Sequence, residues 1–243
     1  MLRRCISVEN QKLAHSHIWL ACLLIPVIPA IMGTFNYLQN LGILKSQWYS
    51  LWTQLTLFYS NFFYAPLIAL YCSWLWRMEH LNHNWNALMT APVPIGDLYF
   101  GKLAVILKVT VFTQLWLGVL YFICGKLAGL PGIFSLEIFF WLLRGTLAAI
   151  SIGALQLLLS MVIRSFSVPI GIALLGSIIG LLVSNKGLGI LWPYSMMLLG
   201  MNANKTEDML SGGTLPFLLG NFFFFALFTA IALLILKKRD VRA

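Results

Sequence analysis

Glu79, His80 and His83 are the residues that come nearest to a metal site in this sequence. Glu79 and His83 lie one helical turn apart. Zinc metalloproteases place two histidines four residues apart on a helix, with a glutamate between them and a third ligand from elsewhere. Here the histidines are three residues apart, and no distant third ligand is evident. The pattern therefore predicts a polar helix face and no metal site.

An apparent phosphate-binding loop follows a few residues later. Residues 96–102, Gly-Asp-Leu-Tyr-Phe-Gly-Lys, match the core of the G-x-x-x-x-G-K motif. Leu103 stands where the motif needs a serine or threonine to hold Mg²⁺, and no buried strand precedes the first glycine. We interpret the match as accidental. The chain is expected to hold no cofactor of its own, so that any ATP and Mg²⁺ would be bound by another subunit.

Composition indicates which class of protein carries these residues. Of the 243 residues, 60% are hydrophobic and only 9% are charged, whereas soluble domains have about 25% charged residues. The formal net charge of +9 would suggest nucleic acid on a soluble domain, but in a polytopic chain it reflects basic residues retained on the cytoplasmic side. An all-α integral membrane protein without a nucleic-acid partner is predicted.

Six segments are apolar over the roughly 20 residues that a helix needs to cross a hydrocarbon core of about 30 Å. They are residues 18–38, 55–76, 103–124, 138–163, 166–184 and 215–236. The uncharged stretch 187–204 contains three glycines and Pro193, which disfavour a continuous spanning helix. We expect a re-entrant or interfacial segment there, packed against the spans. The whole chain, 1–243, is predicted to be one membrane domain with an amphipathic amino-terminal segment.

Basic residues predict the orientation of the spans. If the amino terminus is inside, ten Lys and Arg residues fall on the inner side and four on the outer side. The ten are Arg3, Arg4, Lys12, Arg77, Lys102, Arg164, Lys237, Lys238, Arg239 and Arg242, and the four are Lys45, Lys126, Lys186 and Lys205. Both termini are therefore predicted to be cytoplasmic. Aromatic residues near the outer ends are expected to anchor the helices in the interface: Trp48, Tyr49, Trp52, Trp192 and Tyr194.

Residues 77–102 form the longest predicted cytoplasmic connection, and a partner inside the cell would meet the chain here. Polar and apolar residues recur at helical spacing over 79–88, which predicts a short amphipathic helix that stops near Pro92 and Pro94. A second short helix is expected to begin between Ile95 and Asp97, before the chain re-enters the membrane. A simple interfacial hairpin would have the same pattern.

A glutamate after the second span, a short helix and the segment LMTAPVPIGDLYFGK before the third span together resemble the type-2 class of ABC export permeases. The resemblance extends over the chain, through six spans, cytoplasmic ends and a broken stretch before the last span. Size and the absence of a fused ATPase most resemble the permeases of lantibiotic immunity transporters. The resemblance implies an ATPase-coupling region that contains Glu79, His83, Trp85, Pro92, Pro94, Asp97, Gly101 and Lys102.

The same resemblance implies a function and its partners. The chain would be the permease of an exporter in the bacterial cell membrane that expels an amphipathic, lantibiotic-like antimicrobial peptide and so confers immunity. It would work with two copies of an ATPase subunit, a second identical or related permease, and membrane lipid. An exporter of another hydrophobic substrate or drug remains an alternative. A protein that sequesters the peptide without ATP, or an intramembrane hydrolase, would belong to another class; the hydrolase lacks a base at membrane depth, since all four histidines lie near predicted cytoplasmic ends.

Charged and small residues inside the predicted spans are further candidates for functional or helix-packing roles. Arg144 lies about 9 Å into the fourth span, and Glu137 lies seven residues earlier on roughly the same face. Arg144 would either face a dimer interface or substrate path, or snorkel to the outer surface beside Glu137. Small residues at intervals of four are expected to form helix-packing faces: Gly145, Ala149 and Gly153 on one helix, and Gly176 and Gly180 on another.

Overall fold

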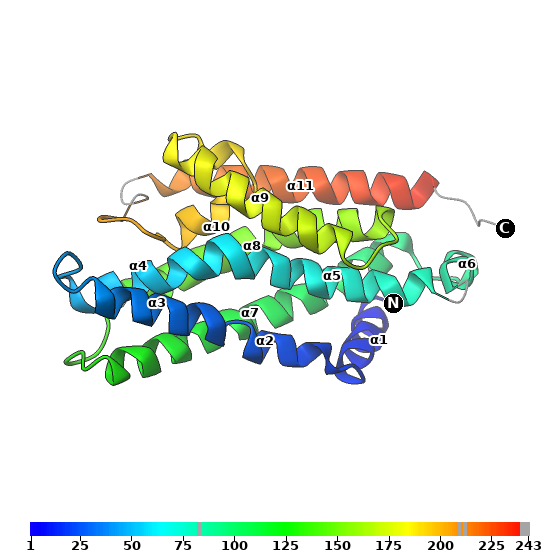
Figure 1. Ribbon diagram of the computed structural model, residues 1–243. Coiled ribbons are helices and arrows are strands. Elements are labelled where there is room, and N and C mark those ends of the chain that lie inside the picture. The colour runs from blue at the N-terminus through cyan, green and yellow to red at the C-terminus, as the bar shows by residue number, and fades with distance from the viewer. Residues whose placement is uncertain (82–83, 209, 211–212, 239–243) are drawn as a thin grey trace.

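The computed structural model describes residues 1–81, 84–208, 210 and 213–238. Within these residues the secondary structure is helical and contains no strands, and six helices are long and apolar enough to cross a membrane. Figure 1 shows the six lying side by side along one elongated bundle. The prediction of an all-α protein with six spans is confirmed.

Four of the six spans extend beyond the predicted bounds at both ends, and the other two extend at one end. Their bounds are His17–Gln39, Gln47–His80, Ile95–Leu127 (α7), Glu137–Val162 (α8), Val168–Asn185 (α9) and Thr214–Lys238 (α11). The second and third spans have 34 and 33 residues. Hydropathy detects only the part of a helix that needs lipid around it, whereas helical hydrogen bonds continue into the ends that pack on protein or meet water.

Prolines interrupt the first two spans. The first consists of a 3₁₀ turn at His17–Leu20, α2 (Ala21–Leu24) and α3 (Val27–Gln39). The break falls at Pro26, which has no N–H to donate. The second consists of α4 (Gln47–Phe58), a π-helical turn at Tyr59–Phe63 and α5 (Tyr64–His80). Pro66 follows this turn, and its ring would clash with the carbonyl four residues earlier in a regular helix.

Short elements cover the two ends of the bundle. One end, called here the termini side, holds α1 (Leu2–Ala14), α6 (Asn84–Thr90), the turn 163–167 and the end of α11 (Figure 1). The opposite side holds the turns 40–46 and 128–136 and the segment after α9. The predicted inner and outer basic residues fall on these two sides respectively, apart from Arg239 and Arg242, which lie outside the described residues.

The stretch after α9 folds back against the bundle. A 3₁₀ turn at Gly189–Leu191 leads to α10 (Ser195–Gly200), and α10 packs against α8 and α9. Most of α10 is buried. The Oγ of its first residue, Ser195, donates to the carbonyls of Gly189 and Trp192. Protein contacts thus satisfy backbone carbonyls of this irregular segment, and its re-entrant or interfacial placement stays a prediction.

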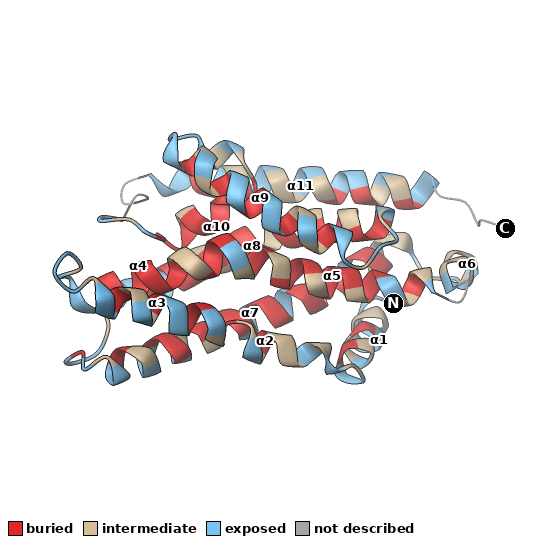
Figure 2. Cartoon of the chain, in the orientation of Figure 1, coloured by how far each residue is buried: buried red, intermediate tan, exposed pale blue. Residues whose placement is uncertain are grey.

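The aromatic residues expected to anchor the outer interface lie mostly inside the protein, so that expectation was wrong. Trp52 is fully buried and its Nε1 donates to the carbonyl of Met201 at 2.8 Å, and Tyr194 is buried against Gly176. Trp48 donates to the carbonyl of Pro131 at 2.7 Å. Trp48 and Trp52 thereby connect α4 to turns on the opposite side, because an indole N–H buried in a membrane protein needs a protein acceptor. Figure 2 shows buried residues concentrated on α5 and α8, while much of α11 is exposed.

Candidate functional site

The amphipathic helix α1 lies against the first third of α7 on the termini side. Gly101 permits this approach, because a Cβ at this position would lie 2.9 Å from the Cβ of Cys5. Four and seven residues beyond Cys5 on α1, the side chains of Glu9 and Lys12 turn into the bundle, where Glu9 is only 2% exposed. A short polar helix therefore places ionisable groups against two membrane spans.

Four side chains from three helices form a buried ion network: Glu9 and Lys12 of α1, Glu79 of α5 and Lys102 of α7. Lys102 is fully buried, and its Nζ donates to Glu9 Oε2 at 3.0 Å and to Glu79 Oε1 at 2.8 Å. Its third hydrogen bond goes to the carbonyl of Leu75 at 3.2 Å, so all three ammonium donors have acceptors. Lys12 Nζ donates to Glu9 Oε1 at 2.8 Å and also to Glu79 Oε1.

The network has two positive and two negative charges, so that burial leaves no net charge at the site. Burial by itself would lower the pKa of Lys12, but Coulombic attraction to Glu9 and Glu79 and the hydrogen bonds to them raise it above 10.5. The contribution of Lys12 to stability is thus complete below pH 10.5 and is lost only as the pH rises through the higher folded value. The ion pairs to Lys12 persist at neutral pH.

Glu79 was predicted to lie on a polar helix face, where a carboxylate would normally meet water, but the structure buries it. Its side chain is 6% exposed and accepts hydrogen bonds from both lysines. The sequence offered no sign that Glu9 and Lys12 would meet it, because α1 and α5 are separated by the whole first span. A glutamate and a lysine three residues apart, Glu9 and Lys12, mark one charged face of α1 but do not indicate which residues it meets.

The rest of residues 77–102 also differs from the predicted shape. No second short helix begins near Ile95; α7 begins there and runs without a break to Leu127. Lys102 therefore lies two turns inside a long helix rather than at a point of re-entry. Pro94 forms the N-terminal boundary of α7, and Asp97 lies in its first turn, where a carboxylate is favoured by the helix dipole. Asp97 Oδ2 is 3.9 Å from the amino group of Met1.

A short helix was predicted over 79–88. In the structure Glu79 and His80 belong to α5, and the short helix α6 spans Asn84–Thr90 at the end of the bundle on the termini side (Figure 1). Trp85 attaches it to the bundle, with ring centroids 5.8 Å from His80 and 5.9 Å from Trp76. Trp76 in turn lies beneath the Lys102 ammonium, 4.8 Å from Nζ to the ring centroid. Pro92 is exposed in the turn that follows α6. His83 lies outside the described residues.

Arg144 pairs with a residue that the sequence did not single out. Its Nη1 donates to Asp208 Oδ1 at 3.0 Å and Oδ2 at 2.9 Å, and Trp141 Nε1 donates to Oδ2 at 3.2 Å. Glu137 is exposed in the first turn of α8 and is not the carboxylate that meets Arg144. The ion pair joins α8 to the segment after α10. Burial by itself would raise the pKa of Asp208, but the N–H of Leu210, Trp141 and Arg144 lower it below 3.8.

We expect Asp208→Asn to loosen the segment after α10. The substitution removes the charge that Arg144 needs, at a cost on the order of 1–2 kcal/mol because both side chains keep some solvent contact. Hydrogen exchange over 195–208 measures the effect, with Glu207→Gln, an exposed neighbouring carboxylate, as the matched control. Equal exchange in the two variants would show that the pair does not hold the segment. The wild-type contribution is present above pH 3.8 and is lost as the pH falls through the lower folded pKa of Asp208.

The small residues of α8 and α9 lie against other parts of the same chain. A Cβ at Gly145 would meet Gln114 and Met201 at 2.6 Å, and one at Gly153 would meet Ile106 at 3.2 Å. Ala149 is fully buried. On α9, Gly176 faces the ring of Tyr194, and a Cβ at Gly180 would lie 3.0 Å from the backbone nitrogen of Ser195. These contacts bring α7, α8, α9 and α10 close together.

Among the described residues, no group of three His, Cys, Asp or Glu side chains lies close enough to hold a metal ion.

No curated protein matches the sequence significantly. The family model for ABC-2 family transporter proteins matches residues 5–180, which run from α1 into α9 and include all four members of the ion network. The membrane domain of this family lacks a nucleotide-binding site and generally pairs with ATPase subunits. With six candidate spans and a match over more than half its length, the chain belongs to the ABC-2 transporter family as a multi-pass membrane permease.

Proposed function

We propose that the ion network of Glu9, Lys12, Glu79 and Lys102 transmits ATP-driven movement from a separate ATPase pair to the spans. The observation that carries this proposal is that one buried cluster joins α1, α5 and α7. The exposed helix α6 offers a contact for an ATPase, and Trp85 connects it to Trp76 and His80 at the end of α5. A push on α6 or α1 would therefore move two spans together.

In this proposal the termini side faces the cytoplasm, where ATP is available. Its support is the larger number of basic residues on that side. Both termini, α6 and the ion network would then meet cytoplasmic partners, and the turns 40–46 and 128–136 would face outward. Two permease chains, identical or related, would form the membrane part of the transporter with two ATPase subunits.

Thiol labelling tests the orientation. Single cysteines at Asn84 and Ser46, both exposed, are introduced into a variant from which Cys5, Cys22, Cys72 and Cys124 have been removed. On intact cells a membrane-impermeant reagent is expected to label Ser46→Cys and to leave Asn84→Cys unlabelled until the cells are opened. Labelling of Asn84→Cys alone on intact cells would reverse the orientation.

We propose further that the exported substrate is an amphipathic antimicrobial peptide of the lantibiotic type, removed from the bacterial membrane so that the cell is protected. The support is the resemblance in span pattern and coupling segment to lantibiotic immunity permeases. Another hydrophobic substrate or drug would use the same coupling site. Export and ATP-independent sequestration of a peptide differ in where the peptide is found afterwards.

Cells that carry this permease and its ATPase partner are expected to survive higher concentrations of one such peptide and to retain less of it. The peptide is measured in the cell pellet and in the supernatant. A catalytically inactive ATPase is the control, because it preserves assembly while removing the driving force. If the inactive ATPase releases as much peptide as the active one, peptide export is the wrong function. Survival with the peptide still cell-associated would instead indicate sequestration.

A further inference from the structure

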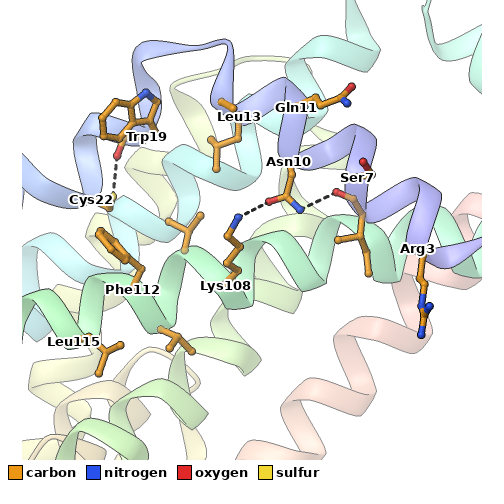
Figure 3. Close-up of a pocket in the computed structure, with 14 residues that line it drawn as sticks. Arg3, Ser7, Asn10, Gln11, Leu13, Trp19, Cys22, Lys108, Phe112 and Leu115 are labelled. Carbon is orange, nitrogen blue, oxygen red and sulfur yellow. Dashed lines mark hydrogen bonds between the residues drawn. The ribbon is translucent and has the colours of Figure 1, made fainter.

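A groove of about 1060 Å³ lies between α1 and α7 on the termini side, away from the ion network. Figure 3 shows that its two ends differ in chemistry. Arg3 lies at one end, near the start of α1, and Asn10 and Lys108 lie in the middle. Trp19, Phe112 and Leu115 lie toward the other end. The groove is thus amphipathic along its length.

The polar part of the groove has two basic side chains, Arg3 and Lys108, and no acidic side chain among its lining residues. Lys108 Nζ donates to Asn10 Oδ1 at 2.9 Å, which fixes its position while leaving two further N–H groups to donate. Within the described residues, neither Arg3 nor Lys108 forms an ion pair. The end is complementary to an anion.

The apolar end has large side chains open to the surroundings. Trp19, Phe112 and Leu115 are 42%, 51% and 62% exposed. Leu115 lies seven residues beyond Lys108 on α7, about 10 Å further along the helix. One ligand that followed the groove would therefore present a charged head to Lys108 and a hydrocarbon chain to Phe112 and Leu115.

The position of Lys108 along α7 places the groove at the membrane boundary. Residues 109–125 are uncharged and are bracketed by Lys108 and Lys126. The two lysines are 18 residues apart, which corresponds to about 27 Å of helix, close to the hydrocarbon thickness of about 30 Å. Lys108 thus reaches headgroup level, and the side chains beyond it lie at the depth of acyl chains.

We propose that this groove binds an anionic phospholipid of the leaflet on the termini side, with its phosphate at Arg3 and Lys108 and an acyl chain against Trp19, Phe112 and Leu115. A zwitterionic lipid would fill the same apolar end but would bring no net charge to the basic end. A ligand with a cationic head would be repelled by Arg3 and Lys108. A bound lipid would stabilise α1 against α7 and thereby the helix that contributes Glu9 and Lys12 to the ion network.

Lipid retention by the purified full chain tests the proposal. The protein is reconstituted with equal amounts of phosphatidylglycerol and phosphatidylcholine, transferred to mild detergent, and the lipids that stay bound are identified by native mass spectrometry. Wild type is expected to retain phosphatidylglycerol in excess. Lys108→Gln and Arg3→Gln are each expected to reduce that excess about fivefold, since one basic residue near an anionic surface contributes about 1 kcal/mol. Lys186→Gln, an exposed lysine on the opposite side, is the matched control and should retain the wild-type excess.

A second measurement locates the lipid. Hydrogen exchange of the α1 amides is expected to slow in bilayers that contain phosphatidylglycerol relative to bilayers of phosphatidylcholine, and this difference should disappear in Lys108→Gln. Equal retention of the two lipids by wild type overturns the proposal. So does an excess of phosphatidylglycerol that survives both Lys108→Gln and Arg3→Gln, because the lipid would then bind elsewhere on the surface. Arg3→Gln alone decides the question if Lys108→Gln fails to fold.

Discussion

Lys102→Met is expected to destabilise the protein by about 3–5 kcal/mol, the usual consequence of removing one partner from a buried ion pair. Lys102 has no exposed surface and donates to Glu9, Glu79 and the carbonyl of Leu75. Its removal leaves two buried carboxylates that share the single charge of Lys12. The loss is measured as the shift in thermal unfolding of the purified chain, and Lys126→Met, an exposed lysine at the other end of α7, is the control.

Combining Lys102→Met with Glu79→Gln separates stability from coupling. The double variant leaves one carboxylate and one ammonium, Glu9 and Lys12, so that the net charge of the site is again zero. Because neutral replacement of a buried ion pair costs much less than breaking it, most of the lost stability should return. Stimulation of the ATPase by substrate should stay below the wild-type level, since α5 and α7 are no longer joined to α1 through Lys102.

Two outcomes would contradict these expectations, and they concern different claims. If the double variant is as unstable as Lys102→Met, uncompensated charge is not the reason for the loss. If the double variant folds and supports full ATP-driven transport, the network is structural only and the proposed coupling role is wrong. The second outcome would leave the membership in the ABC-2 family untouched, because that rests on the sequence match.

Gly33→Ala is expected to push the first span away from the second and to lower the free energy of unfolding by about 1–3 kcal/mol. A Cβ at Gly33 would overlap the Cα of Leu55 and lie 2.9 Å from the carbonyl carbon of Gln54. These are backbone atoms, which cannot rotate away as a side chain does. The hydrogen bond from Asn36 Nδ2 to Gln54 Oε1, 2.6 Å long and one turn away, would be strained with them.

The direction of the change makes this prediction specific. In a helix without close neighbours, replacing glycine by alanine stabilises by up to about 1 kcal/mol. Gly171 of α9 is such a position, since nothing lies within 4 Å of a Cβ built there, and Gly171→Ala is the control. The temperature of thermal unfolding should fall for Gly33→Ala and stay level or rise for Gly171→Ala. A rise in both would mean that α3 and α4 do not cross at Gly33.

Sequence by itself determined the number of spans, their approximate positions and the short helix before Pro92. The physical reason is local: inside lipid each helix must satisfy its own backbone hydrogen bonds, so hydropathy over about 20 residues is sufficient evidence for a span. Proline likewise acts on its own helix, at Pro26 and near Pro92. The resemblance also singled out Glu79 and Lys102 as part of a coupling region, and that role stays a prediction.

Only the tertiary structure decided which partners these residues have. Glu79 meets Lys102 and the residues of α1, and Arg144 meets Asp208, 64 positions away, rather than Glu137 on its own helix. The expected interfacial rings of Trp52 and Tyr194 are likewise buried, against residues that are remote in sequence. An ion pair or a buried indole depends on distances of a few ångströms between helices, and these distances are set by how all the side chains between the helices pack together.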